Sequence, residues 1–325
     1  TGGTGSLGAA GGTYKTFPSN AYVDGTFVPN SSAGAIAITG GSETYDFDAQ
    51  TSAGYYNPWI NGNNLDTDPC SPIYADFRDD SNSHSLIAAH ANKGITFDLA
   101  AIRSATSSAP NLFTVYAGDS RPQADGSISY WVFVDGVLAA NRNSVSNSED
   151  ALFIELASTA RYLTLAISDS NNGIGSDHGY FGDAFLRTAA TWTGGGTDGN
   201  WSTGGNWDGG ATPASSTSTD IWITGDTNVG ALTQDVAAPF VLNRLQVTGA
   251  GMTNAVDTGG QALSFQADGV LRPSIHISRN TAVTLSGALE LAADTEFIID
   301  NGDAANDLTV SGTVTGSGEI IKYGL

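Results

Sequence analysis

Short apolar runs separated by Gly, Asn, Asp and Ser recur along the chain up to Leu186. They lie near residues 35, 45, 95, 115, 132, 153 and 165, and each has the length of a single β-strand. This spacing is typical of an antiparallel sandwich. Only LAAIRSA, directly after the run at 95, has the pattern of a helical turn. The pattern predicts an all-β domain over residues 35–188, preceded by a flexible arm or edge strand over residues 1–34.

The composition changes over residues 189–220, which are dense in Gly, Thr and Ser. This stretch carries Trp192, Trp201 and Trp207, and because each indole favours burial we expect a cap and not a plain linker. Over residues 221–325 the apolar runs are shorter, and from about residue 275 they recur at a tight, regular spacing with no helical pattern between them. This rhythm predicts a parallel β-solenoid, with a second sandwich as the alternative.

The chain is strongly acidic, with 12 Lys and Arg against 33 Asp and Glu and a net charge of −21. Such a surface repels phosphate groups, so we expect no nucleic-acid partner and favour divalent cations. Solubility of an exported protein is the alternative explanation of the charge. The single cysteine, Cys70, allows no disulfide within the chain. Since no stretch approaches about 20 apolar residues, we expect no membrane insertion.

Three stretches of the first domain share their order and spacing with one family. They are LIAAHANKGITFDL (86–99), YWVFVDG (130–136) and LTLAISDSNNGIGSDHGYFGDAFL (163–186). Together they resemble the NPCBM family of carbohydrate-binding modules, over about residues 36–187. The family has an acidic residue and tryptophan after Asp-His-Ala, whereas this chain continues from Asp177 and His178 with Gly179, Tyr180 and Phe181. The resemblance implies a jelly-roll sandwich of the galactose-binding type.

The second half resembles the autotransporter-associated β-strand repeat proteins, which are bacterial surface proteins with solenoid bodies. The stretches that carry this resemblance are TWTGGGTDGNWSTGGNWDGG (191–210) and GSGEIIKYGL (316–325). It implies a solenoid over about residues 190–325 and an extracellular or bacterial cell-surface location. Because that repeat normally runs on into another strand, we expect a truncated solenoid and a longer parent protein.

Two acidic loops are candidate sites for a structural calcium ion, which takes six to eight oxygen ligands. The first candidate set is Asp169, Asn171, Asp177 and Asp183, in and after a glycine-containing loop. The second is Asp66, Asp68 and Asp76, in a loop that also holds two prolines. The alternatives are turns closed by Asp and Asn side chains for the first loop and a solvated acidic loop for the second.

Sugar binding requires an aromatic face for the C–H side of the ring and planar polar groups for the hydroxyls. Two clusters qualify, with burial in the core as the alternative for each: Tyr55, Tyr56 and Trp59 in one loop, and His178, Tyr180 and Phe181 in the other. We expect structural roles for Asp135, in a strand-ending Asp-Gly pair, and for His90, which can donate from one nitrogen and accept at the other. The apolar residues near His90 should be core: Leu86, Ile87, Ile95, Phe97 and Leu99.

No catalytic motif is present: the four histidines match no HExxH spacing, and no GxSxG occurs. We therefore expect no enzyme. The leading hypothesis is a secreted or cell-surface protein with a glycan-binding or adhesive jelly-roll module on a β-solenoid stalk, whose partner is a polysaccharide or glycan. One alternative is a structural subunit of an extracellular filament or surface layer, in which copies pair strand to strand. A weaker alternative is an accessory module of a larger glycoside hydrolase.

Overall fold

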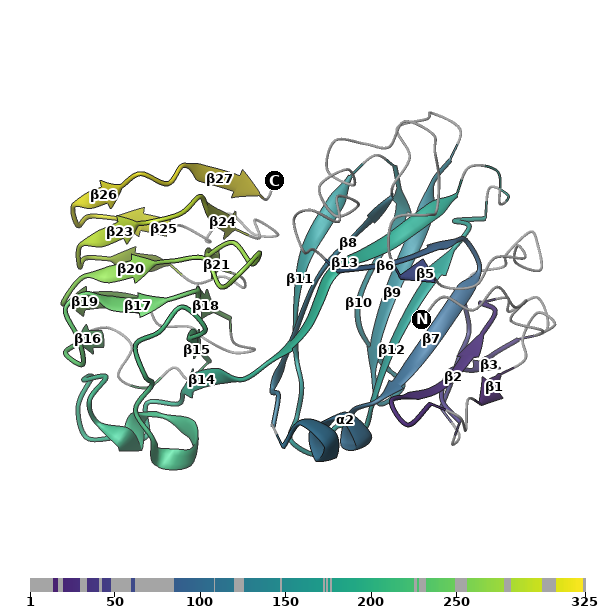
Figure 1. Ribbon diagram of the computed structural model, residues 1–325, viewed down its shortest axis with the longest axis horizontal. Helices are drawn as coiled ribbons and strands as arrows, with labels where there is room; N and C mark the ends of the chain where they lie inside the picture. The colour runs from purple at the N-terminus through teal and green to yellow at the C-terminus, as the bar shows by residue number, and fades with distance from the viewer. Residues whose placement is uncertain are drawn as a thin grey trace. The chain divides into compact units, whose positions relative to one another are not determined.

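The chain forms two compact units, residues 1–188 and residues 189–325 (Figure 1). Within the described residues, no helix has the length and apolar character needed to span a membrane. The computed structural model describes residues 14–16, 20–29, 34–40, 43–47, 60–61, 85–107, 109–119, 126–146, 148–171, 173, 175, 177–224, 227, 232–248, 256–277, 282–299 and 308–323.

The first unit is a sandwich of two antiparallel sheets, which confirms the predicted fold class. One sheet has the strand order β1-β2-β7-β12-β9-β10, the other has the order β11-β8-β13-β6-β5, and β3 pairs with β4 as a separate hairpin. The elements are β1 (Lys15–Thr16), β2 (Val23–Phe27), β3 (Ile36–Ala37), β4 (Thr44–Tyr45), β5 (Ile60–Asn61), β6 (Leu86–His90), β7 (Lys93–Asp98), α2 (Leu99–Thr106), β8 (Leu112–Asp119), β9 (Ile128–Val134), β10 (Val137–Val145), β11 (Glu149–Glu155), β12 (Tyr162–Ser168) and β13 (His178–Arg187).

The main core lies between the two sheets and follows the alternation of side chains along each strand. In β12, Leu163, Leu165 and Ile167 point inward and are at most 2% exposed. The core positions predicted around His90 are confirmed: Leu86 and Leu99 are buried, and the others pack against the core, namely Ile87, Ile95 and Phe97.

A second, smaller core covers the outward face of the six-stranded sheet. Trp131 and Phe133 of β9 and Ala166 of β12 are buried there under side chains from the segment before residue 48. Those covering side chains are Phe27, Ile36, Ile38 and Phe47. Since β2 also pairs with β7, residues 20–29 belong to the sandwich and do not form a loose arm.

A helix cap and a tight turn lie at one end of the six-stranded sheet. Asp98 ends β7 and caps α2, because its Oδ1 accepts a hydrogen bond from the Ala101 N–H at 3.0 Å. Asp135 and Gly136 turn the chain between β9 and β10 with positive φ angles of 48° and 78°. A side chain at Gly136 would also collide with Glu43, so glycine is needed there for conformation and for space.

The second unit is a parallel β-solenoid, as predicted, and its parallel pairing excludes the second sandwich. Three sheets run along it with the orders β14-β15-β18-β21-β24-β27, β16-β19-β22-β25 and β17-β20-β23-β26. The strands are β14 (Ala189–Trp192), β15 (Asp220–Ile223), β16 (Leu232–Gln234), β17 (Phe240–Leu242), β18 (Arg244–Val247), β19 (Val256–Gly260), β20 (Leu263–Phe265), β21 (Ser274–Ile277), β22 (Val283–Leu285), β23 (Leu289–Leu291), β24 (Thr295–Ile299), β25 (Leu308–Val310), β26 (Val314–Gly316) and β27 (Ile320–Tyr323).

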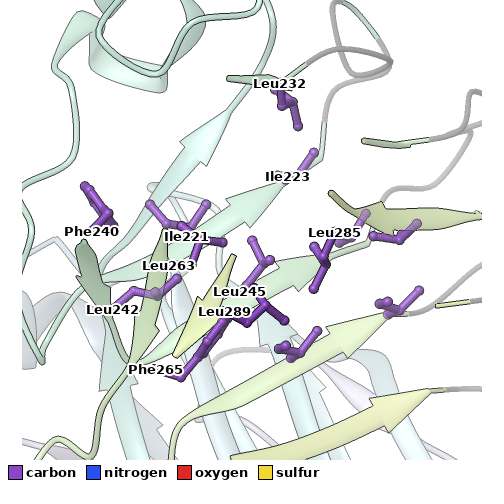
Figure 2. Close-up of a cluster of buried hydrophobic side chains, with 14 of the residues drawn as sticks. Ile221, Ile223, Leu232, Phe240, Leu242, Leu245, Leu263, Phe265, Leu285 and Leu289 are labelled. Atoms are coloured by element: carbon purple, nitrogen blue, oxygen red, sulfur yellow. The ribbon is translucent and has the colours of Figure 1, made fainter. Parts of the chain in front are cut away.

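Inward-pointing residues stack from coil to coil along the solenoid axis. Ile221 pairs with Leu245, Leu245 pairs with Ile275, and all three have no exposed surface. Figure 2 shows Ile221 and Leu245 together with the Phe240, Leu242, Leu263 and Phe265 side chains of a neighbouring sheet. Each coil therefore buries its apolar side chains against the next, which explains the regular spacing in the sequence.

The tryptophan-rich segment closes the solenoid at its first coil. Trp201 meets Trp207 and Phe240 edge to face at centroid distances of 5.6 and 5.2 Å, and Trp192 meets Trp207 at 5.1 Å. The backbone N–H of Trp201 donates to the Thr233 carbonyl at 2.9 Å. All three indoles are at most 3% exposed, so this segment covers apolar surface that the first coil would otherwise present to water.

Candidate functional site

One end of the sandwich gathers three buried carboxylates from three strand ends. Asp119 is the last residue of β8, Asp169 follows β12 and Asp177 precedes β13, and none is more than 1% exposed. Asp169 Oδ2 accepts a hydrogen bond from Asn92 Nδ2 at 3.1 Å, while Asp177 Oδ1 accepts one from the Ser127 N–H at 3.1 Å. These hydrogen bonds connect the turn at Asn92 with the loop after β12, and the segment before β9 with the residue before β13.

Asp177 is the least satisfied member of this group. Within the described part of the chain, its buried Oδ2 has no hydrogen-bond partner. Burial raises the pKa of Asp177 to about 8, and the charges of Asp169 and Asp119 act in the same direction against the stabilising Ser127 N–H. The carboxyl is therefore largely protonated at neutral pH unless a cation compensates its charge.

An unpaired carboxylate oxygen beside two further carboxylates suits a hard cation such as calcium. In the described residues, however, no three acidic, histidine or cysteine side chains are arranged to hold a metal ion. Residues 120–125, which run from β8 toward Ser127, lie outside the described residues, as do residues 172, 174 and 176. Calcium therefore stays a prediction here, with Asp169 and Asp177 as its candidate ligands.

The other two members of the predicted metal set have different surroundings. Asp183 Oδ1 accepts a hydrogen bond from the Ser85 N–H at 2.9 Å, and five residues of strand place it roughly 16 Å from His178. The prediction that Asp183 shares a metal site with Asp177 is therefore wrong. The Asn171 N–H donates to Asp169 Oδ1 at 3.0 Å, which is the side-chain-closed turn given as the alternative.

The sugar contacts predicted on β13 are buried. Tyr180 is 1% exposed, and its hydroxyl donates to Glu149 Oε2 at 2.6 Å. Phe181 has no exposed surface and lies in the main core. Successive side chains of a strand point to opposite faces, and both faces are covered at this position. The prediction that these two rings contact sugar is corrected accordingly.

The two histidines of the predicted motifs face each other across β6 and β13. His90 pairs with His178 in the ladder, and their rings meet at a centroid distance of 4.6 Å. The His90 carbonyl accepts a hydrogen bond from Lys93 Nζ at 3.0 Å. Burial lowers the pKa of Lys93 to about 8. These contacts suit the structural role expected of His90, and a sugar-binding role of His178 stays a prediction.

Six predicted site residues lie outside the described residues. They are the aromatic residues Tyr55, Tyr56 and Trp59 and the acidic residues Asp66, Asp68 and Asp76.

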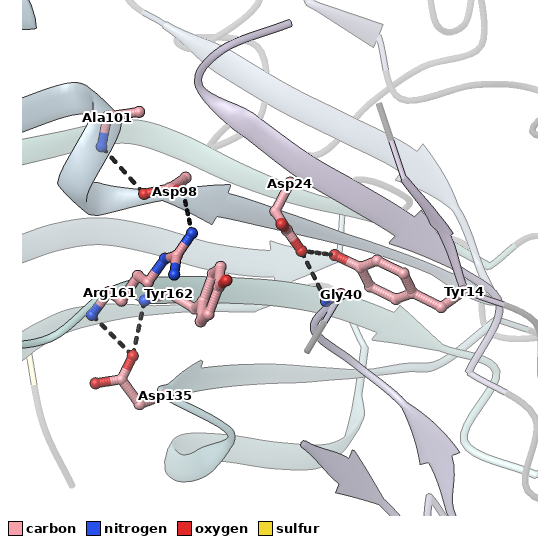
Figure 3. Close-up of polar contacts among 8 residues, drawn as sticks. All are labelled: Tyr14, Asp24, Gly40, Asp98, Ala101, Asp135, Arg161 and Tyr162. Carbon is pink, nitrogen blue, oxygen red and sulfur yellow. Dashed lines mark hydrogen bonds and ion pairs between the residues drawn. The ribbon is translucent and has the colours of Figure 1, made fainter. Parts of the chain in front are cut away.

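The opposite end of the six-stranded sheet carries a polar and aromatic group that sequence reasoning missed (Figure 3). Arg161 lies with Cζ 4.9 Å from the centroid of the Tyr162 ring, and its guanidinium contacts Asp98 Oδ2 at 3.3 Å. Asp135 Oδ1 accepts hydrogen bonds from the backbone N–H groups of Arg161 and Tyr162, both at 2.8 Å. These bonds fasten the β9–β10 turn to the start of β12, which is the structural kind of role expected of Asp135.

Asp24 joins the N-terminal segment to the same end of the sheet. Its Oδ2 accepts hydrogen bonds from the Tyr14 hydroxyl at 2.5 Å and from the Gly40 N–H at 2.7 Å (Figure 3). Burial, followed by the bond to Asp24, raises the pKa of Tyr14 well above its usual value. The phenol therefore remains a hydrogen-bond donor at any working pH.

The antiparallel pairing of β6 with β13 brings the LIAAH and Asp-His motifs side by side. Residues 78–187 match the NPCBM/NEW2 domain family. This match runs from before β6 to the end of β13 and so includes strands of both sheets. The NPCBM/NEW2 part of the chain is thus a carbohydrate-binding-like module. A search of curated proteins returns no match. The resemblance of residues 190–325 to the autotransporter-associated repeat lies outside the NPCBM/NEW2 match and stays a prediction.

Several solved structures resemble the chain in part. A CBM51 from Clostridium perfringens GH95, in complex with methyl-galactose, is 22% identical over 39% of this chain and 79% of that chain, with a TM-score of 0.28. CBM51-2 with INT domains from Clostridium perfringens ZmpB, in complex with GlcNAc, is 21% identical over 32% and 22%, with a TM-score of 0.26. The tandem CBM51 modules of Sp3GH98, the family 98 glycoside hydrolase from Streptococcus pneumoniae, are 14% identical over 39% and 44%, with a TM-score of 0.27.

Proposed function

We propose that the sandwich is a glycan-binding module and that its partner is a polysaccharide or glycan outside the cell. The observation that carries this proposal is the NPCBM/NEW2 match over residues 78–187, which falls on a sandwich with a complete core. Loops and strand ends at the two ends of this sandwich supply polar and aromatic side chains on a rigid support. Binding without catalysis is the activity this arrangement supports best.

The test is a screen of the full chain on an array of neutral and sialylated oligosaccharides, followed by titration calorimetry. Methyl-galactose and GlcNAc are suitable first probes, since two similar structures were solved with them. Binding to at least one glycan is expected. If the folded protein binds no glycan, with or without calcium, the proposal is wrong.

We further propose that the solenoid is the stalk that carries this module at a bacterial cell surface. Its stacked core and its closed first coil support a rigid, extended spacer. Surface labelling of producing cells tests the location.

Light scattering at high protein concentration tests the filament alternative, which requires self-association. Sequencing the parent reading frame tests attachment to a glycoside hydrolase.

Calcium belongs to this proposal as a structural ion at the end that holds Asp169 and Asp177. The support for it is the buried, unpaired oxygen of Asp177. Melting temperatures measured in calcium and in EDTA test it. A higher value in calcium is expected, because a ligand that binds only the folded state stabilises that state.

A further inference from the structure

Five neighbouring strands of the six-stranded sheet begin or end side by side at the end opposite Asp177. The Asp98 N–H donates to the Tyr22 carbonyl at 3.0 Å, Asp98 pairs with Tyr162, and the Asp135 N–H donates to the Tyr162 carbonyl at 2.9 Å. Val137 then starts β10 after the turn. We call this set the strand-end row: Tyr22, Asp98, Asp135, Val137, Arg161 and Tyr162.

Exposed apolar side chains lie on both sides of this row. Among the described residues of the first unit, the exposed large hydrophobic side chains are Tyr22 at 48%, Val137 at 71% and Leu138 at 36%. Tyr22 precedes β2, and the other two begin β10, so all three lie at the same end of one sheet. Three strands lie between β2 and β10, so Tyr22 and Val137 flank the polar groups of the row on opposite sides. Exposed apolar side chains beside polar groups are typical of a binding site.

The polar side chains of the row are fixed by hydrogen bonds and contacts within the protein, and they can still form hydrogen bonds with a ligand. Asp135 is exposed, and its Oδ1 already accepts two backbone N–H groups, which orients the carboxylate and leaves Oδ2 toward solvent. The Arg161 side chain is 60% exposed and rests on Tyr162. Burial and the nearby charge of Asp24 raise the pKa of Tyr162, so its phenol is a donor at neutral pH.

We infer that the strand-end row is the glycan-binding surface of the module and that its ligand is a neutral glycan. The inference rests on the proposed function and assigns its site. The apolar face of a sugar ring would lie against Tyr162 and Tyr22, and the hydroxyls would bond to the Asp135 carboxylate and the Arg161 guanidinium.

The charges of the row exclude acidic ligands. Asp24, Asp98 and Asp135 all raise the pKa of Tyr162 electrostatically, and among the described residues Arg161 is the one cation that acts against them. Asp98 already neutralises much of the Arg161 charge through their contact. A sialylated or sulfated glycan would meet like charges at this surface, whereas a neutral one would not.

Calorimetry of the full chain with the strongest neutral glycan on the array tests the assignment. Tyr162→Ala and Tyr22→Ala should each weaken binding, the former about tenfold, the loss that about 1.4 kcal/mol of contact energy produces. Tyr162→Phe should lose less, because it keeps the ring. Val137→Ser should weaken binding, while Val314→Ser, a matched change at a 46% exposed valine of the solenoid, should not.

The outcomes separate this inference from the proposed function. If the wild type binds a neutral glycan and all the row variants bind it equally well, the site is wrong and the function stands. If the wild type binds only sialylated glycans, the ligand class is wrong. If the wild type binds no glycan, both the site assignment and the proposed function are wrong. Circular dichroism shows whether Tyr162→Ala folds. If it does not, the binding affinities of Tyr22→Ala and Arg161→Gln test the site instead, since both side chains are exposed and their replacement should leave the fold intact.

Discussion

Replacing Asp177 by Asn should make the sandwich more stable at pH 8 when calcium is absent. The pKa of Asp177 is about 8 in the folded protein, against an ordinary value of 3.8. The folded state therefore holds a proton that the unfolded state releases, and the free energy of unfolding falls as the pH rises from about 4 to about 8. The fall is at most about 1.4 kcal/mol per pH unit.

Asparagine removes this dependence and keeps the local geometry. Its carbonyl oxygen can accept the Ser127 N–H, and its amide can donate toward the carboxylates of Asp169 and Asp119. The upper limit of the gain at pH 8 is about 5 kcal/mol, and we expect about half because relaxation and water entry reduce the cost of a buried charge. At pH 5 the two proteins should differ by less than about 1 kcal/mol, because Asp177 is then protonated.

Hydrogen exchange of peptides from β7, β9 and β12 is the appropriate assay, since it reports on the sandwich separately from the solenoid. Wild type and Asp177→Asn are compared at pH 5 and pH 8 in EDTA and then in calcium. Calcium should stabilise the wild type more than the variant, and more at pH 8. Equal pH slopes in EDTA would show that Asp177 is not the titrating group. Equal gains from calcium would place the ion elsewhere.

Three further changes test other parts of the structure. Tyr180→Phe removes the bond to Glu149 and should cost the sandwich about 1.5–3 kcal/mol in urea unfolding; no loss would mean that this bond is not formed in solution. Trp201→Ala opens the solenoid cap and should cost about 3–5 kcal/mol, seen as faster exchange in the solenoid alone, so an effect confined to the sandwich would contradict the cap. Asp135→Ala should lower the melting temperature by several degrees, while Asp135→Asn, which keeps an acceptor, should not; equal melting of both variants would refute the role of Oδ1.

Much of the fold could be predicted because its strands carry local signals. The apolar runs at 95, 115, 132 and 165 are all strands, since each contributes alternate side chains to a shared core. The strand β10 (Val137–Val145) was missed because it is an edge strand with mostly exposed side chains and a polar second half. An exposed edge needs no apolar alternation, so its sequence carries no such pattern.

The candidate sites were harder to predict because they depend on register. Tyr180 and Phe181 look accessible beside a polar loop, yet strand alternation and covering layers bury both. Arg161 and Tyr162 belong to no motif, and they meet Asp98 only through the pairing of β12 with β7. A pairing between residues more than sixty positions apart leaves no local signal in one sequence.

The segment that matches the NPCBM/NEW2 family is shorter than the segment that has to fold together, because the smaller core draws on residues outside the match. The match begins at residue 78, but Trp131 and Phe133 inside it are buried by residues that precede position 48. A protein cut to residues 78–187 would present two aromatic rings to water and leave the edge of β7 without its partner β2. Transfer of this module between proteins would therefore have to include the N-terminal segment, or copies would associate through the uncovered sheet.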